Sequence, residues 1–403
     1  MPRLPKKAEP PRSFTPDSTL KGRRIVFVLF NLELGGAERQ ALILARHLVE
    51  HEQAAVEVWG FNKPGPVVQL CEQLGVPWRL IPYPFQSRSL VRLAGLVRIA
   101  LALRRARPDI LLPYTFVPNV LCGLIWKWTG ARACVWNQRD EGVMRFVTGW
   151  ARSAARRTPA FISNSEAGAR FLVETLNVDP AKVRVIGNGI EELPPKNDRH
   201  AWRARLDIGD DSFVACMVAN LHDNKDHRTL LKAWRRVVDQ SNGQKRVLVL
   251  AGRHDGAYES LTGLAQELDL DRHVRFAGQV LDVPGLLSAA DLGVFSSVTE
   301  GCPNGVLECM SAGLAVAGTD IDAIRSAIGP AGTPFLAPPK DPEALAGVIL
   351  KLADDPDLRV TIGAENRERV RNEYGADRMC HETIDVLKDL LTPKLKSRHL
   401  YVH

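Results

Sequence analysis

The chain has 403 residues, an ordinary composition for a soluble globular protein and a formal net charge of +7 at pH 7. This length predicts two or three domains with substantial cores, and no apolar run approaches the ~18 residues of a transmembrane helix. The excess charge lies at the ends, because residues 1–24 carry +5 and residues 391–403 carry +3. A near-neutral remainder argues against a nucleic-acid partner, and the basic ends could at most touch an anionic membrane.

The cysteines and the N-terminus limit the chemistry and the location further. The seven cysteines form no C-x-x-C pair and no histidine cluster joins them, so reduced thiols and no zinc are expected. The first residues lack the apolar core of a signal peptide. We therefore expect a cytoplasmic protein, at most peripheral at the inner face of the membrane.

The first half of the chain alternates strand and helix patterns. Residues 1–22, rich in Pro and Lys, are expected to be a disordered basic tail. Arg24–Phe30 predicts a buried parallel strand, followed by a turn with Gly35 and Gly36 and a long helix. Helices are predicted near 66–74, 90–106, 117–129, 142–156 and 165–176. Further strands are predicted at Ala54–Trp59, Trp78–Ile81, Asp109–Leu112, Arg132–Trp136, Ala160–Ser163 and Val183–Ile186. This alternation predicts a doubly wound sheet over a first domain, residues 23–190.

The same pattern restarts after a polar, Pro-containing stretch, 191–200, which is interpreted as a linker. The second domain is predicted to span residues 201–370, with helices near 226–239 and 257–268. Its predicted strands are Phe213–Ala219, Arg246–Ala251, His273–Phe276, Leu292–Phe295 and Leu314–Ala317. A long helical segment, roughly 359–392, comes last. Residues 371–403 are assigned to this C-terminal helix and a second basic tail.

Ligands of open α/β sheets bind beyond the carboxyl ends of the strands, and several polar residues follow the predicted strands here. Asn220, Lys225, Arg253 and Gly278 follow three strands of the second domain. Leu292–Phe295 is followed by Glu300, a turn and a helix with Glu308. The turn contains Gly301, Cys302, Pro303, Asn304 and Gly305. Glycines and a helix N-terminus suit a diphosphate, and carboxylates accept hydrogen bonds from sugar hydroxyls. These residues together predict a site for a nucleotide-diphosphate sugar.

The two glutamates, seven residues apart with Gly-x-Pro-Asn after the first, resemble the signature of retaining GT-B glycosyltransferases of family 4. Gly35-Gly36-Ala-Glu-Arg and Ile186-Gly-Asn-Gly-Ile190 resemble further family segments. The resemblance implies two Rossmann-like domains facing across a cleft, with the last helix returning to the first domain. It implies a retaining hexosyltransferase that uses a nucleotide sugar and a glycan or lipid-linked acceptor in cell-surface glycan or glycolipid synthesis. It implies no cofactor and no metal.

The resemblance also assigns roles to residues. Glu300 and Lys225 become catalytic, with Glu300 on the donor sugar and Glu308 on the ribose. The donor-binding set is Gly35, Gly36, Asn220, Lys225, Arg253, Gly278, Glu300, Gly301, Cys302, Pro303, Asn304, Gly305 and Glu308.

Two positions depart from the family pattern. Asn220 stands where an arginine is usual, so the positive charge at the phosphates is one short unless Arg253 supplies it. Tyr114 stands near the place of a usual histidine, and Arg139 follows the next strand. Tyr114 and Arg139 are interpreted as residues on the acceptor or sugar side.

Two other segments contain charged residues that call for an interpretation. Asp320 and Asp322 form an Asp-x-Asp triplet without further acids, and no metal is predicted there. Residues 90–108 are interpreted as a packed helix rather than a membrane-surface helix, because Arg92, Arg98 and Arg104 step to different sides.

Two rival functions remain open. A sugar-nucleotide 2-epimerase shares the fold and would interconvert nucleotide sugars without an acceptor. A catalytically silent glycan-binding or scaffold protein would also fit the departures at Asn220 and Tyr114.

Overall fold

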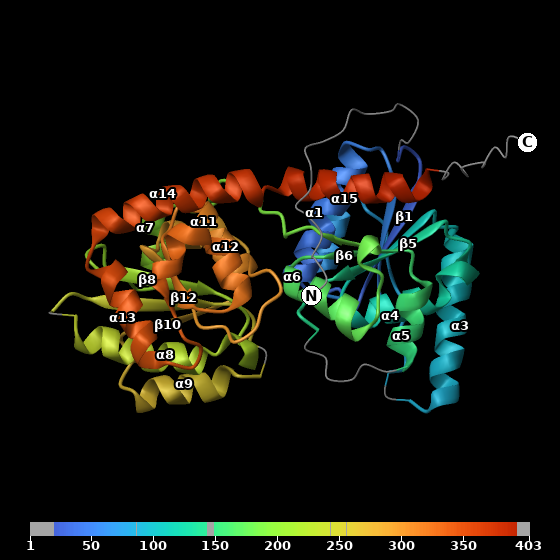
Figure 1. Ribbon diagram of the computed structural model, residues 1–403. Helices are drawn as coiled ribbons and strands as arrows, with labels where there is room; N and C mark the ends of the chain where they lie inside the picture. The colour runs from blue at the N-terminus through green and yellow to red at the C-terminus, as the bar shows by residue number, and fades with distance from the viewer. Residues whose placement is uncertain (1–19, 86, 143–148, 242, 255, 393–403) are drawn as a thin grey trace, which may run out of the picture. The chain divides into compact units, whose positions relative to one another are not determined.

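The computed structural model describes residues 20–85, 87–142, 149–241, 243–254 and 256–392 (Figure 1). Most of the two predicted basic tails, residues 1–19 and 393–403, lies outside the described residues. The chain divides into two compact units. The first comprises the described parts of Met1–Gly187 and Met379–His403, and the second comprises Asn188–Arg378.

The first unit is built on a parallel sheet of seven strands in the order β3-β2-β1-β4-β5-β6-β7. The strands are β1 (Arg24–Leu29), β2 (Ala55–Gly60), β3 (Trp78–Leu80), β4 (Ile110–Pro113), β5 (Ala133–Gln138), β6 (Ala160–Ser163) and β7 (Val183–Val185). The helices are α1 (Gly36–Glu50), α2 (Pro66–Gln73), α3 (Ser89–Ala106), α4 (Phe116–Thr129), α5 (Gly149–Arg157), α6 (Glu166–Arg170) and α15 (Ala376–Leu391). A π-helical segment, Phe171–Thr175, continues α6.

Alternating side chains of β1 show how the two faces of this sheet are covered. Ile25, Phe27 and Leu29 are buried with residues of α1, α2 and α15. Val26 and Val28 are buried on the opposite face with residues of α3 and α4. Because successive strand residues point to opposite faces, a strand segment buried on both sides must be apolar, as residues 25–29 of β1 are.

The C-terminal helix α15 belongs to the core of the first unit. Its buried residues Cys380, Ile384, Leu387 and Leu391 recur every three or four positions, which places them on one helical face. Lys388 Nζ lies 2.9 Å from Glu52 Oε1 beside this face. Helix α15, although it comes last among the elements, is therefore part of the first unit.

The second unit has a parallel sheet of six strands in the order β10-β9-β8-β11-β12-β13. The strands are β8 (Phe213–Val218), β9 (Arg246–Ala251), β10 (Val274–Gly278), β11 (Leu292–Phe295), β12 (Val316–Thr319) and β13 (Leu336–Ala337). The helices are α7 (Arg199–Arg205), α8 (His227–Asp239), α9 (Tyr258–Glu267), α10 (Val283–Ser288), α11 (Asn304–Ser311), α12 (Asp322–Gly332), α13 (Pro342–Ala353) and α14 (Pro356–Glu373). The two parallel sheets with flanking helices confirm the predicted α/β fold class.

The stretch interpreted as a linker, 191–200, is fastened to the second unit. Asp282 accepts hydrogen bonds from the backbone N–H groups of Lys196 and Asn197 at 3.0 Å and from Trp202 Nε1 at 3.0 Å. Although burial by itself raises the pKa of Asp282, these hydrogen bonds hold it well below its usual range. The boundary between the units accordingly falls at Gly187 and Asn188 rather than within 191–200.

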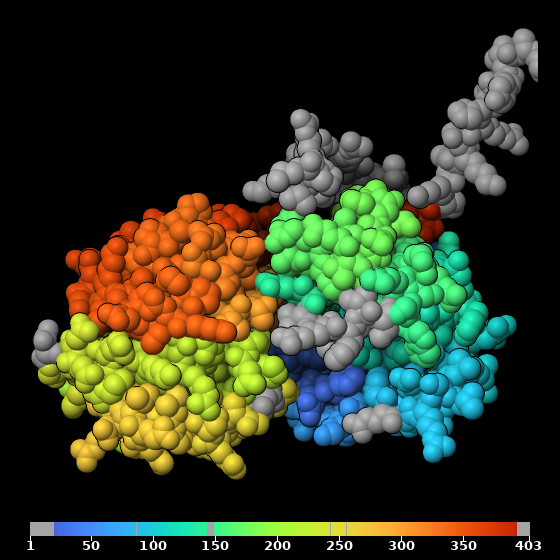
Figure 2. Space-filling model, turned by 60° about the horizontal axis from the view of Figure 1, so that its bottom comes forward, coloured from blue at the N-terminus to red at the C-terminus, as the bar shows by residue number. Residues whose placement is uncertain are grey.

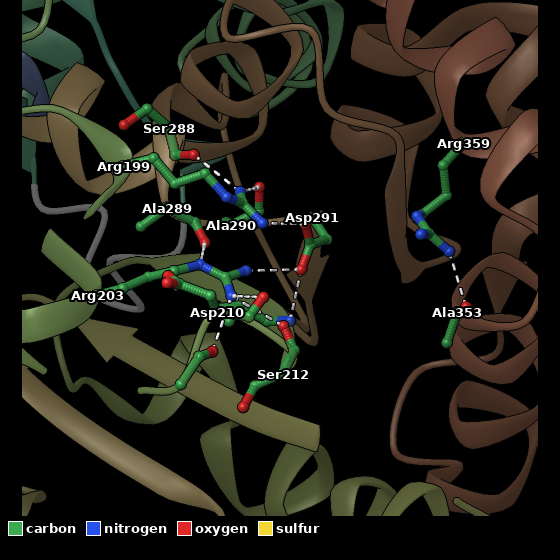
Figure 3. A network of polar contacts seen from close by, with 12 residues as sticks. Arg199, Arg203, Asp210, Ser212, Ser288, Ala289, Ala290, Asp291, Ala353 and Arg359 are labelled. Carbon is green, nitrogen blue, oxygen red and sulfur yellow. Dashed lines mark hydrogen bonds and ion pairs between the residues drawn. The ribbon is translucent and has the colours of Figure 1, made fainter. Parts of the chain in front are cut away.

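Figure 3 shows the arginine that fixes α7 in place. Arg203 is 1% exposed, and its guanidinium donates to the carbonyl groups of Ala289, Gly209 and Ser212 at 3.0–3.1 Å. Its Nη2 also donates to the carboxylate of Asp291 at 3.1 Å. A buried charge with this many acceptors is satisfied, so α7 is an integral part of the second unit.

Several predicted boundaries differ from the structure, and two of these differences matter for the fold. The single helix predicted near 359–392 is two helices, α14 and α15, separated at Tyr374 and Gly375. There Ile190 N donates to Tyr374 O at 2.8 Å and Ala376 N donates to Ile190 O at 3.0 Å, which interrupts the helical pattern. The strand predicted at Leu314–Ala317 lies two residues later, so Gly318 is inside β12.

Among the described residues, no helix combines the length and apolar character needed to cross a membrane.

Candidate active site

The strand order of the second sheet reverses between β8 and β11. The connections that leave these two neighbouring strands therefore run in opposite directions across the sheet. In open parallel sheets, this reversal leaves a crevice at the carboxyl ends of the two strands, where ligands bind. Residues 219–226 follow β8 and residues 296–303 follow β11. The two segments that the sequence analysis selected most strongly are thus brought to one place.

Helix α11 begins directly against the end of β8. A Cβ atom on Gly305 would lie 2.1 Å from the carbonyl oxygen of Val218, so only glycine permits this approach. Gly301, Cys302 and Pro303 form the turn before the helix, and Pro303 has no polar side chain with which to cap it. The first N–H groups of α11 are therefore suited to an anionic ligand.

Lys225 and Glu300 meet at this edge of the sheet. Lys225 Nζ forms an ion pair with Glu300 Oε1, and the side chains are only 21% and 10% exposed, respectively. Ser297 Oγ donates to the same carboxylate oxygen at 2.7 Å, and Ser296 Oγ donates to Lys225 O at 2.8 Å. The predicted diphosphate cation and the predicted sugar ligand are therefore positioned together.

The segment after β11 is also fixed to the next strand. Thr319, expected to lie beyond its strand, is the last residue of β12, and its Oγ1 donates to Ser297 O at 2.6 Å. Val298 N donates to Asn224 O at 2.9 Å, which joins the segment to the turn that carries Lys225. The site thus rests on three strands.

Asn220 and Arg253 connect the loops after β8 and β9. Arg253 N donates to Asn220 Oδ1 at 3.1 Å, and Leu221 N donates to Arg253 O at 2.9 Å. Gly252 precedes this connection, where a Cβ atom would lie 2.0 Å from Ala219 O. Arg253 is thereby held beside the loop of Asn220.

Gly278 ends β10 in a left-handed backbone conformation, with a φ of +65°. Its carbonyl oxygen accepts a hydrogen bond from Gly252 N at 2.8 Å. Glycine populates this conformation without steric cost, so the residue suits the end of β10, which this hydrogen bond ties to the end of β9.

Asn188 was not singled out from the sequence as a site residue. Its side chain is 4% exposed, and Nδ2 donates to Cys302 O at 3.2 Å and to Asn304 Oδ1 at 2.6 Å. It holds the turn and the first residue of α11 in place. Its position between Gly187 and Gly189 in the sequence is the signal that could have identified it.

Glu308 lies on α11, half-buried, near the buried thiols of the core. Burial, and secondarily the charge of Glu308, raises the pKa of Cys216 to about 12. Burial, then Cys216, then Glu308 raise the pKa of Cys309 as well.

The candidate residues of the first unit lie at strand ends of their own sheet. Gly35 is the residue before α1, and Gly36 is the first residue of the helix. Tyr114 follows β4 but is completely buried, and the Arg139 guanidinium carbon lies 4.6 Å from the centre of its ring. Arg139 Nη2 also donates to Asn137 Oδ1 at 3.2 Å. Tyr114 therefore supports Arg139 and has no surface with which to contact a ligand itself.

The Asp-x-Asp triplet does not gather further ligands. Asp320 forms an ion pair with Arg325, and Asp322 is the first residue of α12. Among the described residues, no group of three or more His, Cys, Asp or Glu side chains is suited to hold a metal ion.

Curated relatives of this chain are named as glycosyltransferases. A D-inositol 3-phosphate glycosyltransferase of Kineococcus radiotolerans is 26% identical over 59% of this chain and 58% of its own length. The UDP-Gal:alpha-D-GlcNAc-diphosphoundecaprenol alpha-1,3-galactosyltransferase of Escherichia coli is 23% identical over 60% of this chain and 63% of its own length. The chain thus spans about six-tenths of the length of these curated relatives.

A solved structure covers more of the chain, and so do two family models taken together. The crystal structure of Anabaena Alr3699/HepE in complex with UDP-glucose has a TM-score of 0.79 and 19% identity, covering 91% of this chain and 99% of that one. Residues 34–192 match the model described as Glycosyltransferase Family 4, and residues 198–369 match Glycosyl transferases group 1. With both domain models matched in order over most of its length, the chain belongs to the group 1 glycosyltransferases of the GT-B fold.

Proposed function

We propose that this protein transfers a hexose from a nucleoside-diphosphate sugar to a hydroxyl group of a glycan or lipid-linked acceptor, with retention of anomeric configuration. The observation that carries the proposal is the pairing of Lys225 with Glu300 beside the start of α11 at the β8–β11 reversal. A cation, uncapped helix N–H groups and a carboxylate in one place suit a diphosphate joined to a sugar.

In the reaction proposed, the bond between the anomeric carbon and the diphosphate oxygen breaks. The acceptor oxygen bonds to the same face of that carbon, and the acceptor proton passes to a leaving phosphate oxygen. Lys225 and the N–H groups of α11 stabilise the charge that develops on the diphosphate. Glu300 orients the donor sugar through its hydroxyls, and Glu308 binds the ribose.

The likeness to relatives suggests where to look for the substrates. The E. coli relative is named for UDP-galactose and a diphosphoundecaprenol-linked acceptor, and the Anabaena structure contains UDP-glucose. UDP-hexoses are therefore the first donors to test, and lipid-linked saccharides the first acceptors. Arg139, held by Tyr114 and Asn137, is proposed to contact the acceptor or the donor sugar.

The two glutamates provide a test of these roles. Hydrogen bonds to a charged group contribute about 1.5–3 kcal/mol, so Glu308→Gln should weaken binding of free UDP by roughly tenfold or more. Glu300→Gln should leave UDP affinity nearly intact but lower turnover, because its contact is made to the transferring sugar. The measurements are calorimetric titration with UDP and product formation with the donor that binds.

Glu365→Gln is the matched control, because Glu365 is an exposed residue of α14. Loss of UDP affinity in Glu300→Gln with retention in Glu308→Gln would reverse the two roles. Parent-like binding and turnover in both variants would refute the site. Interconversion of nucleotide sugars without acceptor would favour the 2-epimerase, and donor binding without any turnover would favour a silent binding protein.

A further inference from the structure

Helix α3 in the first unit presents apolar side chains to solvent as well as to the core. Gly95, Leu96, Ile99, Ala100 and Leu103 are buried. The outward-facing apolar residues are Leu90 (81% exposed), Val91 (49%), Leu93 (50%), Val97 (45%) and Leu101 (48%). A helix that is apolar on both faces requires two apolar neighbours, and the sheet of the first unit is only one of them.

Four of these five exposed residues form a continuous stripe. At ~100° per residue, Leu90, Leu93, Val97 and Leu101 fall within about 80° of one another around the helix axis. Arg104 continues the same stripe, and Arg105 lies at its margin; both arginines are exposed. This stripe runs the length of an 18-residue helix.

The neighbouring helices extend both the apolar and the basic character. Trp150 of α5 is 40% exposed, and the Arg92 guanidinium carbon lies 5.8 Å from the centre of its ring. Trp128 at the end of α4 is 55% exposed. Of the eleven large hydrophobic side chains exposed in the described part of the chain, seven lie on α3, α4 and α5. In Figure 2 the cyan surface around α3 adjoins the green-blue surface of the segments that follow it.

Charge is segregated to the same side of the sheet. Helices α3, α4 and α5 contain eight Lys and Arg residues and no Asp or Glu. Helices α1 and α15, which cover the opposite face, contain six Asp and Glu residues and four Lys and Arg residues, a net charge of −2. The near-neutral total of the folded body therefore conceals one strongly basic side.

We propose that α3, with the adjoining ends of α4 and α5, docks on an anionic lipid surface. The leucine and valine stripe would enter the boundary between headgroups and acyl chains, the tryptophans would lie at the headgroup level, and the arginines would face anionic headgroups. A nucleic acid would match the arginines but leave the apolar stripe without a partner, because phosphate contacts are polar. The proposal builds on the proposed function, because membrane binding would bring the enzyme to lipid-linked acceptors. It holds whichever nucleotide sugar is the donor.

Residues 90–108, interpreted as mainly a packed helix, do pack against the core through one face of α3. That interpretation followed only Arg92, Arg98 and Arg104 around the helix. The exposed apolar stripe, rather than the arginines, defines the outward face. The helix is packed on one side and exposed and apolar on the other.

The test is flotation of the full-length protein with vesicles of phosphatidylcholine, with and without one-third phosphatidylglycerol. Arg104→Gln with Arg105→Gln should weaken binding to anionic vesicles by roughly fivefold per arginine. Leu93→Gln with Val97→Gln should weaken it by about tenfold or more, because these apolar side chains would leave the interface. Thermal unfolding should be unchanged in both variants, since all four residues are exposed.

Matched controls come from the second unit, where Leu281 and Val360 are 69% and 72% exposed and Arg272 is exposed. Leu281→Gln with Val360→Gln, and Arg272→Gln, should bind vesicles like the parent. Absence of anionic-vesicle binding in the parent overturns the proposal, as does parent-like binding by both α3 variants, which would point to the basic ends. Binding to duplex DNA that only the arginine variant loses would replace lipid by nucleic acid. UDP titration of the α3 variants should match the parent, which separates this surface from the active site.

Discussion

At the residue scale, Asn220 shows how one departure from the family pattern alters a loop. Arginine has no hydrogen-bond acceptor in its side chain, whereas Asn220 Oδ1 accepts from Arg253 N at 3.1 Å. The amide therefore joins the loops after β8 and β9. It holds a different arginine beside the segment that carries Lys225. Whether the Arg253 side chain supplies the positive charge that an arginine at position 220 would carry stays a prediction.

His227, the first residue of α8, gives a prediction about pH. It is 2% exposed, and among the described residues its Nε2 has no hydrogen-bond partner. Burial, and secondarily the charge of Lys225, lowers the pKa of His227 to about 4. The unfolded chain, with an ordinary histidine pKa near 6.5, binds the proton more readily, so stability is lost as pH falls through this interval.

We expect about 2 kcal/mol of the parent's unfolding free energy to be lost between pH 7 and pH 5 through this residue. His227→Gln should show a correspondingly smaller loss, measured by urea unfolding at both pH values. His254→Gln is the control, because His254 is exposed. An identical pH dependence in parent and His227→Gln would contradict the assignment.

At the element scale, the site depends on the close approach of α11 to β8. The helix is only eight residues long, and its position is set by Gly305 against Val218 O and by Asn188 against Asn304. A short helix gains little stability by itself, so packing and these contacts must fix its N-terminus. The direction in which the first N–H groups of α11 point therefore depends on how the helix packs against β8.

Gly305→Ala tests this dependence. The added Cβ atom would lie 2.1 Å from Val218 O, a backbone atom that cannot rotate away. We expect a loss of stability of about 1–3 kcal/mol and weaker UDP binding, measured by urea unfolding and calorimetry.

Gly347 provides the matched control on helix α13, because a Cβ atom there would meet nothing within 4 Å. Gly347→Ala should leave UDP binding unchanged and stabilise the protein by about 0.5–1 kcal/mol through helix propensity. If Gly305→Ala behaves like Gly347→Ala, the close approach of α11 to β8 does not position the site.

At the scale of the whole molecule, the proposed reaction relies on protein groups rather than a metal. Lys225 and the N–H groups of α11 supply positive potential, and Asp320 is occupied by Arg325. We expect transfer activity, assayed with the donor identified by binding, to survive removal of divalent cations by chelation.

Asp320→Asn with Asp322→Asn is the corresponding variant and should retain activity. Activity that disappears in chelator and returns with magnesium or manganese would instead assign these aspartates as ligands. Loss of activity in the double variant without any metal effect would give them a structural role.

The sequence by itself determined the alternation of elements, because buried parallel strands must be apolar on both faces. Ala160–Ser163, Arg246–Ala251 and Leu292–Phe295 have the predicted boundaries for this reason. It also indicated which strand ends carry polar chemistry, since that rule depends only on strand direction.

Only the tertiary structure decided which of these residues meet. Lys225 and Glu300 are 75 positions apart and form a pair because β8 and β11 are neighbours in the sheet. Residues expected to form a linker belong to the second unit, because Lys196 and Asn197 donate hydrogen bonds to Asp282, about 85 positions away. The outward face of α3 was equally undetermined, because this helix has apolar residues on both its buried and its exposed side, and the pattern does not indicate which side the sheet covers. Pairing between distant segments and the choice of buried face depend on three-dimensional packing, which local patterns do not specify.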